Sequence, residues 1–149
     1  MEKIVATNRK AYHDYFIGES VEAGLVLLGS EIKSIRAGRV NLRDSYVSIL
    51  DGEAWLLNAH VGAYKQAGRE GHEPRRKRKL LLHRQQINRL QGKVLEKGFT
   101  IVPLRLYLKG SRAKVEIALV RGKRKYDKRA AIARKDAQRT MDRALKERR

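Results

Sequence analysis

The sequence predicts a mainly β fold with short helices, in which an antiparallel sheet closes into a small barrel and a basic C-terminal tail follows. Three observations support this fold class. Pairs of alternating apolar runs are joined by turn residues, most apolar runs have the length of strands, and large apolar side chains become scarce after Val120. The chain has 149 residues, of which 42% are hydrophobic, so one domain with a modest core is expected. We therefore place the barrel in residues 1–120 and the tail in 121–149.

The first predicted elements are a strand and a short helix. The apolar run at 24–28 (GLVLL) has the length of a strand. Residues 31–37 (EIKSIRA) follow as a helix, with Ser30 as the expected N-cap and Gly38 as the residue that ends it.

A β-hairpin is predicted within residues 45–59. Asp51-Gly52 is a favoured two-residue hairpin turn, and it separates two alternating apolar runs. Val47 and Ile49 place their side chains on one face of the first strand.

Residues 62–79 form the longest irregular stretch, and their glycines and proline predict a mobile loop. The stretch ends in five consecutive basic residues, from Arg75 to Lys79. Such runs occur on solvated faces as well as on nucleic-acid-binding surfaces, and the charge of the whole chain favours contact with phosphate here.

A helix and a second hairpin complete the predicted barrel. Residues 84–97 repeat apolar side chains on one side and end at Gly98, which predicts a helix. Strands at 99–108 and 113–120 follow, and Pro103 indicates an edge or a bulge in the first of them. Short strands in this number predict an OB-like closed barrel, because closure removes unpaired strand edges.

The charge of the chain indicates a polyanionic partner. There are 35 Lys and Arg against 16 Asp and Glu, a formal net charge of +19. Nucleic acid is the favoured partner, since an anionic membrane surface would call for a basic amphipathic helix with large apolar residues.

The C-terminal tail, 121–149, has 13 basic and 4 acidic residues. Small apolar side chains recur at helical spacing after Asp127, but this stripe is too narrow to bury a core. We expect a tail that is disordered alone and becomes helical along a polyanion. A tail that only increases solubility is the alternative.

Composition and motifs argue against an enzyme. The chain has no cysteine, which excludes disulfides, thiolate metal sites and thiol nucleophiles. The four histidines are far apart, and no hydrolase, metalloprotease or P-loop motif occurs. No apolar run approaches the roughly 18 residues of a membrane span. We expect no catalysis, no metal or other cofactor, and a cytoplasmic protein.

The sequence resembles the bacterial SmpB family over almost its whole length. The matching motifs follow one another along the chain: NRKA at 8–11, HDY at 13–15, EAGL at 22–25, GSEIKSIR at 29–36, NLRDSY at 41–46, PRRKRKLLLH at 74–83, PLRLY at 103–107, KVEIA at 114–118 and GKRKYDKR at 122–129.

This resemblance implies an adaptor of trans-translation. Such a protein binds the tRNA-like domain of transfer-messenger RNA and brings it, with elongation factor Tu, to stalled ribosomes. Its tail enters the empty mRNA channel and replaces codon–anticodon pairing at the decoding centre. The expected partners are transfer-messenger RNA and the ribosome, with elongation factor Tu as an indirect partner, and a monomer is expected. A ribosomal or other general OB-fold RNA-binding protein is the alternative, and a nuclease is a third possibility.

The resemblance also implies an RNA-binding set. Asn8, Glu22 and Leu81 match family positions important for binding transfer-messenger RNA, and His13 matches one at the RNA interface. Leu81 is equally natural as a core residue. The set is completed by basic side chains that position the RNA through its phosphates: Arg9, Lys10, Lys33, Arg36, Arg75, Arg76, Lys77, Arg78 and Lys79.

A second implied set lies in the tail. Gly122 matches the pivot between the folded body and the tail, and Tyr126 stands where many members have another ring that could stack on an rRNA base. The other expected decoding-site residues are Lys123, Arg124, Lys125, Asp127, Lys128, Arg129, Arg134, Lys135, Arg139 and Arg143.

Overall fold

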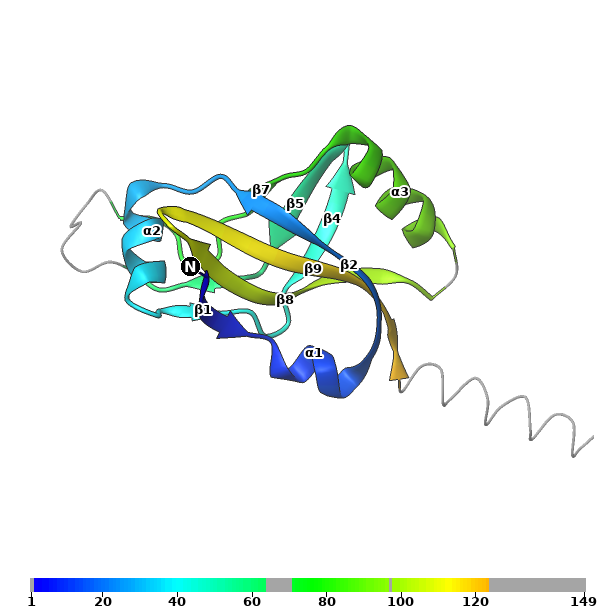
Figure 1. Cartoon of the computed structure of the whole chain (residues 1–149), viewed down its shortest axis with the longest axis horizontal. Coiled ribbons are helices and arrows are strands. Elements are labelled where there is room, and N and C mark those ends of the chain that lie inside the picture. Colours follow the sequence, from blue (N-terminus) through cyan, green and yellow to red (C-terminus); the bar gives the residue numbers. More distant parts are fainter. Residues whose placement is uncertain (1, 64–70, 97, 124–149) are drawn as a thin grey trace, which may run out of the picture.

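The computed structural model describes residues 2–63, 71–96 and 98–123, and they form the mainly β fold that the sequence predicts. Seven antiparallel strands make one sheet in the order β1–β8–β9–β2–β7–β5–β4. Helices α2 and α3 lie at opposite ends of this sheet (Figure 1). Its strands are β1 (Glu2–Thr7), β2 (Tyr15–Leu25), β4 (Tyr46–Leu50), β5 (Glu53–Leu57), β7 (Arg78–Leu81), β8 (Thr100–Lys109) and β9 (Arg112–Gly122).

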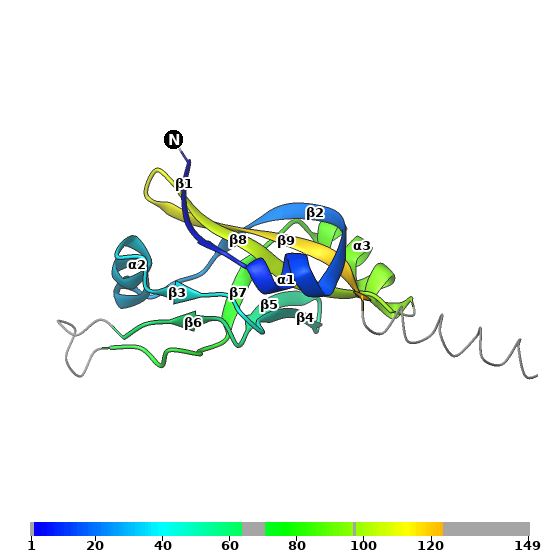
Figure 2. The same cartoon turned by 90° about the horizontal axis from the view of Figure 1, so that it is seen from below.

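A second sheet and three helices complete the described part of the chain. The second sheet pairs β3 (Val40–Asn41) with β6 (His60–Val61) and lies next to α2 (Gly29–Arg36), as Figure 2 shows. The other helices are α1 (Arg9–Asp14) and α3 (Arg84–Leu95).

Both predicted hairpins are confirmed. β4 and β5 pair around Asp51 and Gly52, whose φ angles of 52° and 76° are the left-handed values that a two-residue turn of this kind requires. β8 and β9 pair from Thr100 to Lys109, and Gly110 takes a φ of 58° in the turn between them.

The bulge predicted at Pro103 is also confirmed, because the register of β8 against β9 shifts between Pro103 and Arg105. On its other side, β8 pairs with β1 only from Arg105 to Lys109. The missing N–H of Pro103 therefore interrupts no ladder on that side.

The predicted closure of the barrel is wrong. β1 and β4 stand at the two ends of the strand order, and no ladder joins them among the described residues. The reason is that β1 ends at Thr7, where the chain turns into α1. This leaves residues 100–104 of β8 without a strand partner on that side. β4 approaches β8 without pairing with it, so the sheet has an open seam between these two strands.

The strand boundaries need further correction. The sequence does not predict β1. Of the strand predicted at 24–28, only Gly24 and Leu25 are in a strand, as the end of β2, which begins at Tyr15; residues 26–28 connect β2 to α2. The loop predicted over 62–79 is shorter, because Arg78 and Lys79 belong to β7. Part of that loop, 64–70, lies outside the described residues.

The two helices predicted within the barrel are confirmed, with one changed cap. α3 ends at Leu95, close to the predicted end. α2 begins at Gly29, and Ser30 does not cap it. Instead, the Glu31 side chain accepts a hydrogen bond from the backbone N–H of Leu28 at 2.8 Å. The Oγ of Ser30 lies 2.9 Å from Nδ1 of His72, which ties α2 to the loop before β7.

The core lies between the strands and the inner faces of α2 and α3. Ile35 of α2 and Leu90 of α3 are buried against it. Burial of one such side chain contributes roughly 1.5–3 kcal/mol. Completely or almost completely buried apolar residues include Ile35, Leu42, Leu56, Leu80, Ile101, Leu106, Val115 and Ile117. A second, smaller cluster under α1 contains Ala11, Val102, Leu104, Ala118 and Val120.

Little of the predicted tail is described. β9 continues to Gly122, so the sheet extends past the predicted boundary at residue 120. Residues 124–149, with the helix predicted after Asp127, lie outside the described residues. In the part that is described, no helix has both the length and the apolar character needed to cross a membrane.

Candidate nucleic-acid interface

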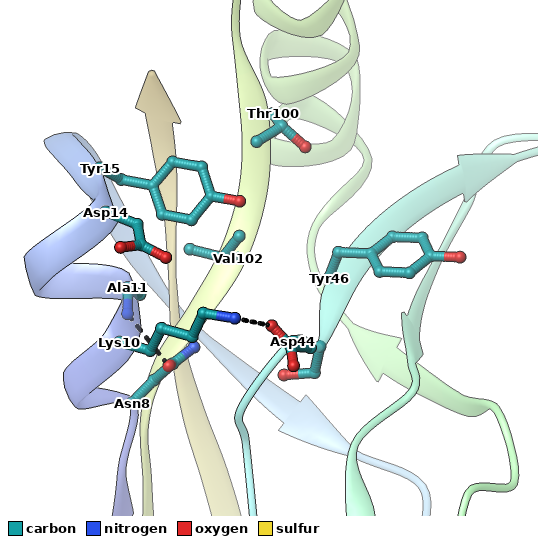
Figure 3. A pocket seen from close by; sticks show the side chains of 10 residues that line it. Asn8, Lys10, Ala11, Asp14, Tyr15, Asp44, Tyr46, Thr100 and Val102 are labelled. Atoms are coloured by element: carbon teal, nitrogen blue, oxygen red, sulfur yellow. Dashed lines mark hydrogen bonds and ion pairs between the residues drawn. The ribbon is translucent and has the colours of Figure 1, made fainter. Parts of the chain in front are cut away.

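The open seam of the sheet contains a cleft of about 370 Å³ (Figure 3). It lies between α1, the loop before β4 and the start of β8. Tyr15 stands on one side of it and Tyr46 on the other, with Thr100 and Val102 of β8 between them. A closed barrel would fill this space with strand pairing, so the cleft is a direct result of the turn from β1 into α1.

Asn8 shapes this cleft from inside. Its Oδ1 accepts from the backbone N–H of Ala11 at 3.2 Å, which caps α1, and its Nδ2 donates to the carbonyl of Pro103 at 2.9 Å. The residue is only 5% exposed. The structure thus gives Asn8 a positioning role for α1, and its predicted contact with RNA stays a prediction.

Lys10 and Asp44 form an ion pair across the cleft, with 2.6 Å between Nζ and Oδ1. The hydrogen bond from Lys10 lowers the pKa of Asp44. Asp14 also lines the cleft, which therefore contains two carboxylates and one lysine side chain. The cleft is therefore suited to a polar, uncharged group or a ring rather than to a phosphate.

The outer side of α1 is exposed. Arg9 faces solvent, and the side chain of His13 is 84% exposed, with its Nδ1 2.9 Å from Oδ1 of Asp14. Both side chains are therefore accessible to a partner, and their predicted contact with RNA stays a prediction.

Glu22 belongs to a polar cluster that spans three neighbouring strands. Its Oε2 accepts from the hydroxyl of Tyr107 at 2.7 Å and from Nζ of Lys109 at 2.9 Å, both from β8 on the far side of β9. The bond from Lys109, followed by that from Tyr107, lowers the pKa of Glu22. Burial, with the bond to Glu22, raises the pKa of Tyr107, and the bond to Glu22 raises that of Lys109.

The second oxygen of Glu22, Oε1, has no hydrogen-bond partner within the described residues. It remains free to accept from an amino group of a base. The same sheet region carries Leu81, which pairs with Gly24 of β2 and is 54% exposed. Leu81 is therefore a surface residue, and the alternative that placed it in the core is wrong.

The basic run from Arg75 to Lys79 is not a uniform phosphate-binding face. Arg78 is 1% exposed and donates from Nε to Oε2 of Glu31, from Nη1 to the carbonyl of Ala59 and from Nη2 to that of Pro74. The prediction that Arg78 contacts RNA is therefore corrected, because its donors are used inside the fold.

Glu31 is the buried centre of this arrangement. It is 0% exposed, and its Oε1 lies 2.6 Å from Nη2 of Arg76. Burial alone would raise the pKa of Glu31. The hydrogen bonds from Arg76, from the backbone of Leu28 and from Arg78 outweigh burial, so the pKa is lowered.

Apart from the buried Arg78 and from Arg76, whose guanidinium donates to Glu31, the basic side chains of the run and of α2 are exposed or partly exposed. Arg75 and Lys77 are exposed, with Nζ of Lys77 4.7 Å from the centre of the Trp55 ring. Lys79 forms an ion pair with Glu53 at 3.1 Å. On α2, Lys33 and Arg36 are exposed.

At the end of β9, Gly122 pairs with Tyr15, and Nζ of Lys123 lies 5.6 Å from the centre of the Phe16 ring. The remaining predicted tail residues lie outside the described residues: Arg124, Lys125, Tyr126, Asp127, Lys128, Arg129, Arg134, Lys135, Arg139 and Arg143.

Sequence reasoning missed Tyr107 and Lys109 as partners of Glu22, because they are far from it in the chain. Alternation along β8 is a signal for them, since Tyr107 and Lys109 are two residues apart and share a face. The same alternation places Arg78 on the inner face of β7 beside Leu80, which is buried. Within residues 2–63, 71–96 and 98–123, no group of three or more His, Asp or Glu side chains could hold a metal ion.

Comparisons with a family model, with curated proteins and with solved structures all point to the same family. The family model described as SmpB protein matches residues 5–147. SsrA-binding proteins of Roseiflexus castenholzii and Carboxydothermus hydrogenoformans are 65% and 57% identical; the alignments cover 99% of this chain and 94% and 99% of those proteins. A solved chain from a structure described as "tmRNA-SmpB: a journey to the center of the bacterial ribosome" is 46% identical with a TM-score of 0.69, over 80% of this chain and 84% of that one. The chain therefore belongs to the SmpB family.

Proposed function

We propose that this chain is an RNA-binding adaptor of trans-translation, which binds transfer-messenger RNA and acts with it on the ribosome. The family match over residues 5–147 carries this proposal. The likeness to a solved chain described as part of a tmRNA–SmpB complex in the ribosome supports both partners. The net charge of +19 is consistent with binding to RNA.

The tRNA-like domain of transfer-messenger RNA is the proposed ligand of the folded body. The Glu22–Tyr107–Lys109 cluster, with Leu81 beside it, offers one carboxylate oxygen and an apolar side chain to unstacked bases. The exposed basic side chains, among them Arg9, would position the RNA through its phosphates. Recognition would then depend on the folded shape of the RNA more than on its sequence.

The basic C-terminal tail, predicted at 121–149, is the proposed ribosomal module. Its basic residues would enter the vacant mRNA channel and stand in for codon–anticodon pairing, with Gly122 as the pivot. Elongation factor Tu would join through the alanylated RNA, and the protein would act as a monomer in the cytoplasm.

A competition experiment tests the proposal. Full-length protein is bound to labelled transfer-messenger RNA at ~150 mM salt, and unlabelled competitor of equal length and comparable folding is added. An adaptor should prefer transfer-messenger RNA by about 100-fold, or ~2.7 kcal/mol. Equal competition would instead indicate a general RNA-binding protein, and metal-dependent degradation of either RNA would indicate a nuclease.

A further inference from the structure

A second pocket, which shares Asp44 with the seam cleft, lies where β3 and β6 meet the loop before β7. Its volume is about 330 Å³, near the lower end of the roughly 300–1,000 Å³ range of ligand pockets. Every side chain that lines it is polar: Asn41, Arg43, Asp44, Asn58, His60 and Arg75. Such a lining is unsuited to an apolar ligand.

The walls of this pocket are fixed by hydrogen bonds between segments far apart in the sequence. Nδ2 of Asn58 donates to the carbonyl of Asp44 at 3.0 Å, and Oδ1 of Asn58 accepts from Nη1 of Arg75 at 3.0 Å. Asn58 and Asp44 have φ angles of 65° and 61°, left-handed values that are uncommon for residues other than glycine. Asn58 therefore holds the guanidinium of Arg75 in place through backbone geometry that costs free energy.

The charge of the pocket favours an anion. Arg43 and Arg75 line it with one acidic residue, Asp44. The carboxylate of Asp44 is already bound to Lys10 at 2.6 Å, whereas Arg43 lies 3.9 Å from it. The two guanidinium groups therefore keep donors for a further partner, and their planar geometry matches phosphate.

The remaining groups suit the rest of a nucleotide. Oδ1 of Asn41 accepts from the backbone N–H of Arg43 at 2.9 Å, which directs its Nδ2 to other acceptors. His60, which pairs with Asn41 across the small sheet, adds a half-buried ring. A carboxamide and an imidazole beside two guanidinium groups form a site for a base or ribose next to a phosphate.

We propose that this pocket binds one unstacked nucleotide of a structured RNA. Its phosphate lies between Arg43 and Arg75, its base or ribose contacts Asn41 and His60, and Asn58 positions Arg75. This inference rests on the proposed RNA-binding function and adds a discrete site to it. Transfer-messenger RNA and ribosomal RNA share the required chemistry, so the test has one arm for each.

The test compares Arg43→Gln, Arg75→Gln and Asn58→Gly with the unaltered chain and with Arg84→Gln, an exposed residue at the start of α3. Glycine tolerates the φ of Asn58, so Asn58→Gly removes the support of Arg75 without a new strain. Affinity is measured for transfer-messenger RNA in one arm and for isolated ribosomes in the other. All three pocket variants should bind about 10-fold more weakly in the same arm. In that arm, each arginine variant should also reduce the slope of log affinity against log salt concentration by about one. Arg84→Gln should show neither change.

A titration with small probes tests the nucleotide itself. Backbone amide NMR signals of the full chain are followed with the four nucleoside 5′-monophosphates, ribose 5-phosphate and inorganic phosphate. At least one nucleotide should shift the signals of Asn41, Asp44 and His60 at lower concentration than inorganic phosphate, and the ribose 5-phosphate titration distinguishes a ribose contact from a base contact.

Two results would overturn the site while leaving RNA binding by the chain intact. One is affinity of the pocket variants equal to that of Arg84→Gln in both arms. The other is identical shifts with inorganic phosphate and with every nucleotide. Loss of transfer-messenger RNA preference by the unaltered chain would overturn the proposed function instead.

Discussion

The guanidinium of Arg78 and the carboxylate of Glu31 form an ion pair that is closed to solvent, with 1% and 0% of the two side chains exposed. Arg78 comes from β7 and Glu31 from the first turn of α2, and Arg76 donates to the same carboxylate. The pair therefore fastens α2 to the sheet.

Loss of one partner should destabilise the fold strongly. Arg78→Met removes the hydrogen-bond donors to Glu31, Ala59 and Pro74. The buried carboxylate of Glu31 then keeps only the hydrogen bonds from Arg76 and from the backbone of Leu28. We expect the free energy of unfolding in urea to fall by about 3–5 kcal/mol. Lys77→Met, in the exposed part of the same run, is the control and should change it by less than about 1 kcal/mol. If Arg78→Met lowered the free energy of unfolding by less than about 1 kcal/mol, a structural role for Arg78 would be contradicted.

The same carboxylate predicts a dependence of stability on pH. The pKa of Glu31 is lowered below its ordinary value of 4.5 in the folded state. Its contribution to stability is therefore complete above that value and is lost as the pH falls through the folded pKa. Urea midpoints between pH 7 and 3 should fall more steeply for the parent than for Glu31→Gln. Parallel curves would show that Glu31 does not carry this dependence.

Glu22 and Tyr107 should be coupled in RNA binding. Glu22→Ala removes both the free Oε1 and the anchor of Lys109, so affinity for transfer-messenger RNA should fall by about 10- to 100-fold. Tyr107→Phe should cost less, because Lys109 still holds Oε2. A double-mutant cycle in RNA affinity should give a nonzero coupling energy, with thermal unfolding as the check on folding. Fully additive losses would argue that Tyr107 does not position Glu22.

Binding of the body should depend strongly on salt. If it contacts on the order of 5 phosphates, the logarithm of affinity should fall with that of salt concentration at a slope of roughly −4 to −5. Titrations of transfer-messenger RNA at four or five potassium chloride concentrations measure this slope. A flat response would contradict an electrostatic contribution from the exposed basic side chains.

Short-range signals predicted much of the fold. Asp51-Gly52 and Pro103 specify their turn and bulge through local backbone chemistry, and α3 follows from apolar spacing. β1 and most of β2 have no such signal: Phe16 and Ile17 are exposed even though they lie in a strand. Their pairing depends on long-range partners in β8 and β9.

The candidate site also combines features that local sequence signals predict with features that depend on long-range contacts. A run of five basic residues indicates a charged surface, but only the strand alternation of β7 determines that Arg78 points inward. The open seam depends on Asn8, which caps α1 and bonds to Pro103, 95 residues away. Closure of a barrel is a general expectation from the number of strands, whereas the seam stays open because β1 ends at Thr7 and leaves the start of β8 without a strand partner on that side.

The folded body is proposed to bind the RNA and the basic tail to act on the ribosome, and deletion of the tail separates these two roles. Truncation after Lys123 keeps all of β9, and the truncated and full chains are compared for binding of transfer-messenger RNA and for tagging of nascent chains on stalled ribosomes. We expect the truncated chain to bind RNA within about 3-fold of the affinity of the full chain and to lose tagging. Tagging by the truncated chain, or an equal loss of RNA binding and tagging, would contradict this separation of roles.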